Sequence, residues 1–161
     1  IPGLKGLLEN IQANVLVADL SLRLLYLNPR AIEKLRVIED EIERAFRVSV
    51  DEMQGASIHR FHRDPRRVER ILRNPKALPH EAEFTFGSVT LKARINGIFN
   101  PELVGYVVAW EDTSEENRRL AEITRITNMV ENAPTNIMFA DRELKIRFMN
   151  PAMIKTLKVI E

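Results

Sequence analysis

The sequence predicts an α+β domain: a five-stranded antiparallel sheet with several short helices inserted between its second and third strands. The first observation is the order of patterns along the chain, which runs strand, strand, helices and then three strands. The second is an internal repeat, because residues 9–39 align without a gap with residues 131–161, and 13 of the 31 aligned positions are identical. A repeat offset of 122 residues corresponds to a whole domain rather than a solenoid unit. The chain therefore holds one complete module and the start of another.

The first elements are a helix and a hairpin. Residues 1–12 predict an N-terminal helix, because their apolar side chains recur at helical spacing. Two short apolar runs, at 14–19 and 22–27, are separated by a tight turn and predict two paired strands.

Helices follow the hairpin. Asn28-Pro29 favours a helix start, since asparagine caps well and proline suits the first helical position. The helical spacing of apolar residues continues over 29–47, in one helix or in two. Residues 51–63 predict irregular structure, and Asp64-Pro65 begins a further helix over 65–72.

Three strands complete the module, over residues 80–87, 89–97 and 103–111. Apolar and polar residues alternate in them, which sorts the side chains between the two faces of a sheet. Glu81 and Glu83 fall on the outer face, where a solvated strand explains them better than acid–base chemistry. The residues expected to face the core are Ala82, Phe84, Phe86, Val89, Leu91, Ala93, Ile95, Val104, Tyr106, Val108 and Trp110.

The predicted domain organisation follows from these elements. The N-terminal helix (1–12) precedes a first domain over residues 13–112, a connecting helix over 113–133, and a truncated second domain over 134–161. In the connecting helix, apolar residues and a threonine follow 3-4-3 spacing, which fits a parallel coiled coil or a helix packed on a neighbouring domain: Leu120, Ile123, Thr127 and Val130.

Composition narrows the classes of function. The net charge of +1 gives no strong attraction to nucleic acid, and no nucleic-acid partner is expected. The absence of cysteine excludes disulfides, iron–sulfur clusters and covalent c-type haem attachment. No glycine-rich phosphate loop, nucleophile elbow or HExxH motif is found, so an enzyme is not expected. No apolar run approaches the roughly 18 residues of a membrane span. We expect a cytoplasmic location, which includes the cytoplasmic part of a membrane receptor.

The order of elements, with Asn28-Pro29 opening the first inserted helix and Trp110-Glu-Asp-Thr closing the last strand, resembles the PAS sensor fold. Three stretches resemble, more specifically, the haem-binding PAS domains of aerotaxis-type methyl-accepting chemotaxis receptors: GASIHRFHRDP, LPHEAEF and GYVVAW. The resemblance implies that His62 ligates the iron of b-type haem, that Trp110 faces the opposite side, and that Leu91 lies beside Trp110. Several relatives carry a second histidine where this chain has Arg67.

The residues around these positions suit such a site. Apolar walls are available from Ile58, Phe61, Ile71 and Leu72. A neutral imidazole from His62 would hold the iron, and the Trp110 indole N–H, which can only donate, would stabilise a bound gas such as oxygen. From its strand position alone, Trp110 is better explained as a large core residue, and the resemblance reverses that order.

The remaining polar residues have alternative roles. His80 is either a strand-end histidine or a residue at the haem edge. His59 either shares a metal site with His62 or lies near a haem propionate. Arg60, Arg63 and Arg67 are either propionate partners or ordinary solvated charges.

The resemblance also implies a route for the signal. Asp112 and Thr113 match the ending of many PAS domains, where the acid ties the sheet to the outgoing helix, often through a basic residue such as Arg118 or Arg119. We therefore expect a gas sensor that signals through its C-terminal helix to a chemotaxis signalling domain, as a homodimer formed through helices. The alternatives are a cofactor-free PAS relay and dimerisation module, or a PAS pocket for a small organic ligand or flavin.

Overall fold

The computed structural model describes the backbone of residues 2–160 and the side chains of residues 6–160. The chain divides into two compact units, Ile1–Ser114 and Glu115–Glu161. The first unit is an α+β domain on a five-stranded antiparallel sheet, as the sequence predicts.

The sheet has the order β2-β1-β5-β4-β3, so the second and third strands along the chain lie at opposite edges. All neighbouring strands are antiparallel. The segment between β2 and β3 must therefore pass across the whole sheet. The strands are β1 (Asn14–Asp19), β2 (Leu24–Leu27), β3 (His80–Phe86), β4 (Val89–Phe99) and β5 (Leu103–Asp112).

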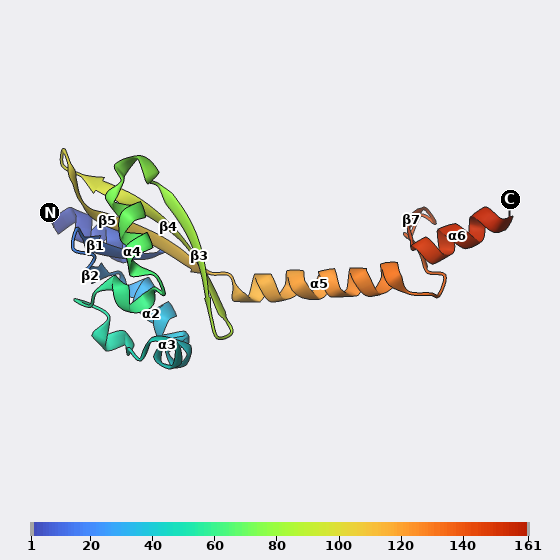
Figure 1. Ribbon diagram of the computed structural model, residues 1–161, viewed down its shortest axis with the longest axis horizontal. Helices are drawn as coiled ribbons and strands as arrows, with labels where there is room; N and C mark the ends of the chain where they lie inside the picture. The colour runs from blue at the N-terminus through green and yellow to red at the C-terminus, as the bar shows by residue number, and fades with distance from the viewer. Residues whose placement is uncertain (1, 161) are drawn as a thin grey trace. The chain divides into compact units, whose positions relative to one another are not determined.

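That crossing segment forms a layer of short helices on one face of the sheet (Figure 1). Their buried side chains, including Leu35, Ile42 and Leu72, pack against inward-facing strand residues such as Ile95 and Trp110. The helical elements of the first unit are α1 (Pro2–Asn10), α2 (Pro29–Val37), α3 (Glu39–Phe46), η1 (Val50–Glu52), η2 (Ile58–Phe61), α4 (Pro65–Arg73) and η3 (Pro75–Ala77).

The structure corrects two of the predicted elements and decides a third that was left open. The second strand begins at Leu24 rather than at residue 22, because Leu22 adopts a left-handed φ of 61° in a turn closed by its N–H to the Asp19 carbonyl. The helical stretch 29–47 is two helices, broken at Ile38 with φ −106°. Residues 51–63, predicted irregular, contain the short helix η2. Ser57 caps the start of this helix, because its hydroxyl accepts a hydrogen bond from the His59 N–H.

The helices that flank the first domain also differ slightly from prediction. The N-terminal helix, predicted over 1–12, ends at Asn10, and residue 1 lies outside the described residues. The connecting helix, predicted over 113–133, is α5 (Ser114–Asn132).

Asn28 is the polar centre of the first unit. It is fully buried, and its Oδ1 accepts hydrogen bonds from Val15 N at 2.9 Å and Ala31 N at 3.0 Å. Its Nδ2 donates to the carbonyls of Ala13 at 2.8 Å and Leu8 at 3.2 Å. One side chain therefore caps α2 and fixes both the first strand and the end of α1 to it.

The second unit repeats this design. After α5, β6 (Met138–Ala140) and β7 (Ile146–Met149) form a two-stranded sheet that leads into α6 (Pro151–Ile160). The buried Asn150 accepts from Ile137 N and Met153 N and donates to the carbonyls of Val130 and Thr135. These partners correspond one by one to those of Asn28. The predicted second domain, 134–161, is therefore built like the start of the first, and residue 161 lies outside the described residues.

The second unit leaves apolar side chains exposed where the first unit buries them. Leu22 is 2% exposed whereas its counterpart Leu144 is 86% exposed, and Leu35 is 4% exposed whereas Leu157 is 40% exposed. In the first unit these side chains face the crossing helices and the later strands, and the described second unit has only two strands.

Replacing Asn28 with alanine is expected to lower the free energy of unfolding of the first unit by about 3 kcal/mol, because it leaves several buried backbone groups without partners. Urea unfolding followed by Trp110 fluorescence measures this unit specifically, since Trp110 is the single tryptophan. Asn150→Ala is the matched control and should leave that transition unchanged. Equal midpoints for Asn28→Ala and the wild type would contradict the prediction.

Candidate functional site

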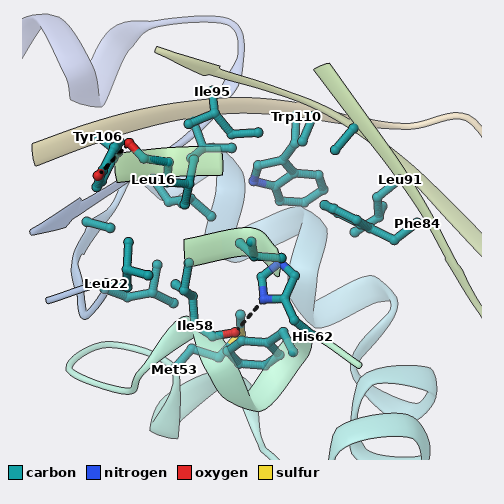
Figure 2. Close-up of a pocket in the computed structure, with 18 of the residues that line it drawn as sticks. Leu16, Leu22, Met53, Ile58, His62, Phe84, Leu91, Ile95, Tyr106 and Trp110 are labelled. Carbon is teal, nitrogen blue, oxygen red and sulfur yellow. Dashed lines mark hydrogen bonds between the residues drawn. The ribbon is translucent and has the colours of Figure 1, made fainter. Parts of the chain in front are cut away.

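An apolar cavity of about 260 Å³ lies between the sheet and the helices of the first unit. Figure 2 shows strands along one side of the cavity and the helical segments that carry Ile58 and His62 on the other. The lining side chains come from both layers and include Leu16, Leu22, Leu24, Leu35, Phe46, Met53, Ile58, Phe61, His62, Ile71, Leu72, His80, Phe84, Leu91, Ile95, Tyr106, Val108 and Trp110. The predicted site residues His62, Trp110, Leu91, Phe61, Ile71, Leu72 and His80 therefore surround one space.

His62 directly follows the short helix η2. Its Nδ1 lies 2.7 Å from the carbonyl oxygen of Ile58. A carbonyl oxygen can only accept, so Nδ1 carries the proton and the neutral ring keeps its lone pair on Nε2. In Figure 2 the second nitrogen of His62 points away from Ile58 and into the cavity, toward the sheet. The ring edge packs against Phe84 with centroids 6.1 Å apart. This arrangement suits a metal ligand whose tautomer is fixed by the backbone.

Trp110 enters the cavity from the opposite wall. Its strand position places the indole on the inner face of β5, in register with Asn14 on β1 and Ala93 on β4. The side chain is buried, and its Nε1 has no hydrogen-bond partner among the described residues. An unpaired buried N–H is costly, typically about 1–3 kcal/mol, so this group is a candidate donor to a guest in the cavity. Leu91 lies diagonally across from Trp110 on the same face.

The other predicted residues take simpler positions. His80 begins β3 and lines the cavity. His59 is not among the lining residues, and its Nδ1 has no partner among the described residues. Arg60, Arg63 and Arg67 are exposed to solvent. Within the described part of the chain, no three His, Asp or Glu side chains gather as a metal-binding group.

Tyr106 contributes a contact that the sequence analysis did not identify. The residue is expected on the inner face, but its hydroxyl donates to the Leu72 carbonyl at 2.9 Å and so joins β5 to the last turn of α4. Burial raises the pKa of the Tyr106 hydroxyl, so the group stays protonated and able to donate. The available signal was a tyrosine in an otherwise apolar row, because a buried hydroxyl needs a partner.

The end of β5 is tied to the start of α5 by a small polar cluster. Asp112 Oδ1 accepts from the Ser114 N–H at 2.9 Å and from the Ser114 hydroxyl. Ser114 Oγ accepts from Thr90 N at 2.8 Å, and Thr113 N donates to Thr90 O at 2.9 Å. Asp112 Oδ2 also lies 3.8 Å from Lys34 Nζ on α2. Lys34 is therefore a cation beside Asp112 that the sequence analysis did not identify.

Comparisons with known proteins agree with this architecture. A family model described as a PAS domain matches residues 4–73 and again residues 124–161. This chain belongs to the PAS domain family. The two matched ranges follow the internal repeat, so each unit carries PAS sequence.

Two relatives indicate the kind of PAS protein. The methyl-accepting chemotaxis protein McpB of Pseudomonas aeruginosa is 30% identical over 126 residues, which are 76% of this chain and 18% of McpB. The structure described as "The Aer2 Receptor from Vibrio cholerae is a Dual PAS-Heme Oxygen Sensor" is similar with a TM-score of 0.59 and 27% identity, and it covers 63% of this chain and 94% of that chain. None of the helices described between residues 2 and 160 is long and apolar enough to cross a membrane.

The neutral His62 ring is expected to be the Nδ1-protonated tautomer, because Ile58 presents only an acceptor to that nitrogen. Long-range proton–nitrogen NMR correlations of the imidazole rings, recorded on the chain without added cofactor, distinguish the two tautomers. His80 serves as an internal comparison. An Nε2-protonated His62 would contradict the arrangement and remove the free lone pair from the cavity.

Proposed function

We propose that the first PAS domain binds b-type haem through His62 and senses oxygen or another diatomic gas. The observation that carries the proposal is the pair of groups that enter one apolar cavity from opposite walls. His62 directs Nε2 into the cavity from the helical side, and Trp110 directs an N–H from the sheet side that has no partner among the described residues. The similarity to a receptor described as a PAS-haem oxygen sensor supports the same reading.

The residues of the cavity fit a flat apolar cofactor. His62 would hold haem through its iron, and the haem would supply a metal centre able to bind a diatomic gas. At about 260 Å³, the cavity is slightly below the ~300–1,000 Å³ usual for organic ligands. Loading therefore requires the η2–α4 segment to move outward from the sheet, a rearrangement comparable with those seen in other binding proteins.

The protein's own groups have separate tasks in this proposal. The Ile58 carbonyl keeps the proton on His62 Nδ1, which orients the ring and leaves Nε2 free to bind. Trp110 donates from the sheet side to a polar guest and in doing so gains the partner that its N–H lacks. A guest that accepts this hydrogen bond stabilises one position of the indole over others, which is what a ligand must do to shift a conformational equilibrium.

The signal would leave the domain through β5. Trp110 lies two residues before Asp112 on this strand, and Asp112 and Thr113 connect the strand to Thr90, Lys34 and the start of α5. The ion pair with Lys34 contributes little by itself, since Lys34 is partly exposed. The buried hydrogen bonds among Asp112, Ser114 and Thr90 are the stronger coupling.

The partners follow from the relatives. The similarity to McpB supports a chemotaxis-type output domain, a sensory and non-enzymatic role, and a cytoplasmic location for this part of the receptor. Exposed apolar residues on α5 support homodimerisation through this helix: Leu120, Ile123, Ile126 and Met129.

An alternative is a PAS domain that holds no haem and instead binds a small apolar molecule or relays signals without a cofactor. The apolar lining of the cavity favours this alternative over a flavin. Absorbance spectra of the haem-supplied protein in ferric, ferrous and gas-exposed states separate the readings, because only a haem sensor shows a Soret band that shifts on reduction and again with the gas.

His62→Ala is expected to abolish haem loading while the domain stays folded, because the iron loses its protein ligand. The ratio of Soret to protein absorbance measures loading, and circular dichroism checks the fold. His59→Ala is the matched control, since His59 lies three residues earlier and does not line the cavity. Full haem stoichiometry in His62→Ala would overturn the assignment.

Trp110→Leu and Trp110→Phe are expected to retain haem and to weaken oxygen binding by about 10- to 100-fold, the factor that corresponds to one hydrogen bond to a charged or polarised acceptor. Oxygen titration of the ferrous protein, followed by absorbance, measures the affinity. Leu91→Ile controls for packing beside the indole. Unchanged oxygen affinity in both tryptophan variants would remove Trp110 from the role.

A further inference from the structure

We infer that Tyr106 closes a passage by which a small gas molecule enters the cavity of the first PAS domain. Tyr106 is 1% exposed, yet it lines both the apolar cavity and a separate groove on the protein surface. The other walls of the groove include Leu20, Arg73, Phe99 and Leu103. The inference deepens the proposed gas-sensing function and rests on it for the identity of the guest.

The wall between groove and cavity is thin at this point. On α4, Leu72 lines the cavity and the next residue, Arg73, lines the groove. On β4, the residue in register with Tyr106 is Gly97, which has no side chain. A Cβ at Gly97 would lie 2.7 Å from Leu103 Cδ1 and 2.7 Å from the Phe99 ring, so the ends of these two side chains occupy the space instead. The Tyr106 ring is therefore the side chain that separates the groove from the cavity. It is held by β5 at its backbone and by α4 at its hydroxyl.

One hydrogen bond holds the ring in the closed position. The Tyr106 hydroxyl donates to the carbonyl of Leu72, in the last turn of α4, where carbonyls have no partner within the helix. Breaking this bond frees the ring to rotate without disturbing the sheet hydrogen bonds of β5. In Figure 2 the dashed line beside the Tyr106 label marks this bond, and Leu16 lies between it and Trp110.

The position suits delivery of gas to the sheet side of a bound haem. Tyr106 and Trp110 are four residues apart on β5 and face the same side of the sheet, so the passage opens onto the wall that carries the indole N–H. The sheet itself is closed by continuous strand pairing. The alternative mouth would lie beside Phe84, which lines the cavity and is 36% exposed at the sheet edge formed by β3. Phe84 packs against His62, so a haem held by His62 would fill the space next to that mouth.

The test is quenching of Trp110 fluorescence by dissolved oxygen in the full chain without haem. Trp110 is the single tryptophan and lines the cavity, so its quenching rate reports the entry of oxygen itself. Tyr106→Phe is expected to raise the quenching rate constant about five-fold, the factor that corresponds to one lost hydrogen bond. Leu103→Ala removes part of the groove wall and leaves the hydrogen bond from Tyr106 to Leu72 intact. This variant should also raise the quenching rate constant.

Two control variants make the result specific. Tyr26→Phe alters the only other tyrosine, which lies on β2 and lines neither the cavity nor the groove, and should leave quenching unchanged. Phe84→Leu widens the opposite mouth. If Phe84→Leu raises quenching whereas Tyr106→Phe and Leu103→Ala leave it at the wild-type rate, the inference is overturned. A purely structural role for Tyr106 would shift the urea midpoint of Tyr106→Phe without changing its quenching.

A second measurement uses the haem-loaded chain. Carbon monoxide rebinding after flash photolysis should be faster in Tyr106→Phe than in the wild type and unchanged in Phe84→Leu, because haem fills the second mouth. If no haem binds, the proposed function fails while the fluorescence result still decides whether oxygen passes Tyr106. If haem binds and rebinding is the same in Tyr106→Phe and the wild type, the passage is rejected and the haem assignment stands.

Discussion

The structure of the first unit depends on one topological constraint: the second and third strands along the chain lie at opposite edges of the sheet. The chain must cross the sheet between them, and it does so as a series of short helices on one face. A cavity lies between this helical layer and the sheet. His62 belongs to the crossing segment and Trp110 to the sheet. The same constraint therefore places the two groups on opposite walls of the cavity.

The energetics of the cavity point in the same direction. A buried N–H without a partner destabilises a fold, so an apolar residue of similar size at position 110 would be the more stable choice for a domain whose cavity stays empty. His62, in contrast, has one nitrogen satisfied by the backbone and the other left open to the cavity. Under the proposed function, the guest would act as a Lewis acid at His62 and as a hydrogen-bond acceptor at Trp110, and it would complete both groups.

Much of this arrangement was predictable from local patterns. Alternation in the last three strands assigned Leu91, Tyr106 and Trp110 to the inner face, and Asn28-Pro29 marked the start of α2. The details that escaped prediction are non-local or depend on the backbone. The left-handed φ at Leu22 is unusual for a leucine, and the pairing of Asp112 with Lys34 joins residues far apart in sequence. The hydrogen bond from Tyr106 to the Leu72 carbonyl depends on the residue at which α4 ends. The spacing of apolar residues does not predict that residue.

Both ends of α5 are held by hydrogen bonds to buried polar residues. At its first residue, Ser114 is bonded to Thr90 of the first sheet and to Asp112. Near its last turn, the carbonyl of Val130 accepts a hydrogen bond from Asn150, as the carbonyl of Leu8 in α1 accepts one from Asn28. Under the proposed function, a change at the end of β5 would act on a helix whose far end is bonded to the buried asparagine of the next module. Since that asparagine also caps α6 and holds the Ile137 N–H, displacement of the helix end would disturb the start of the second module before any other part of it.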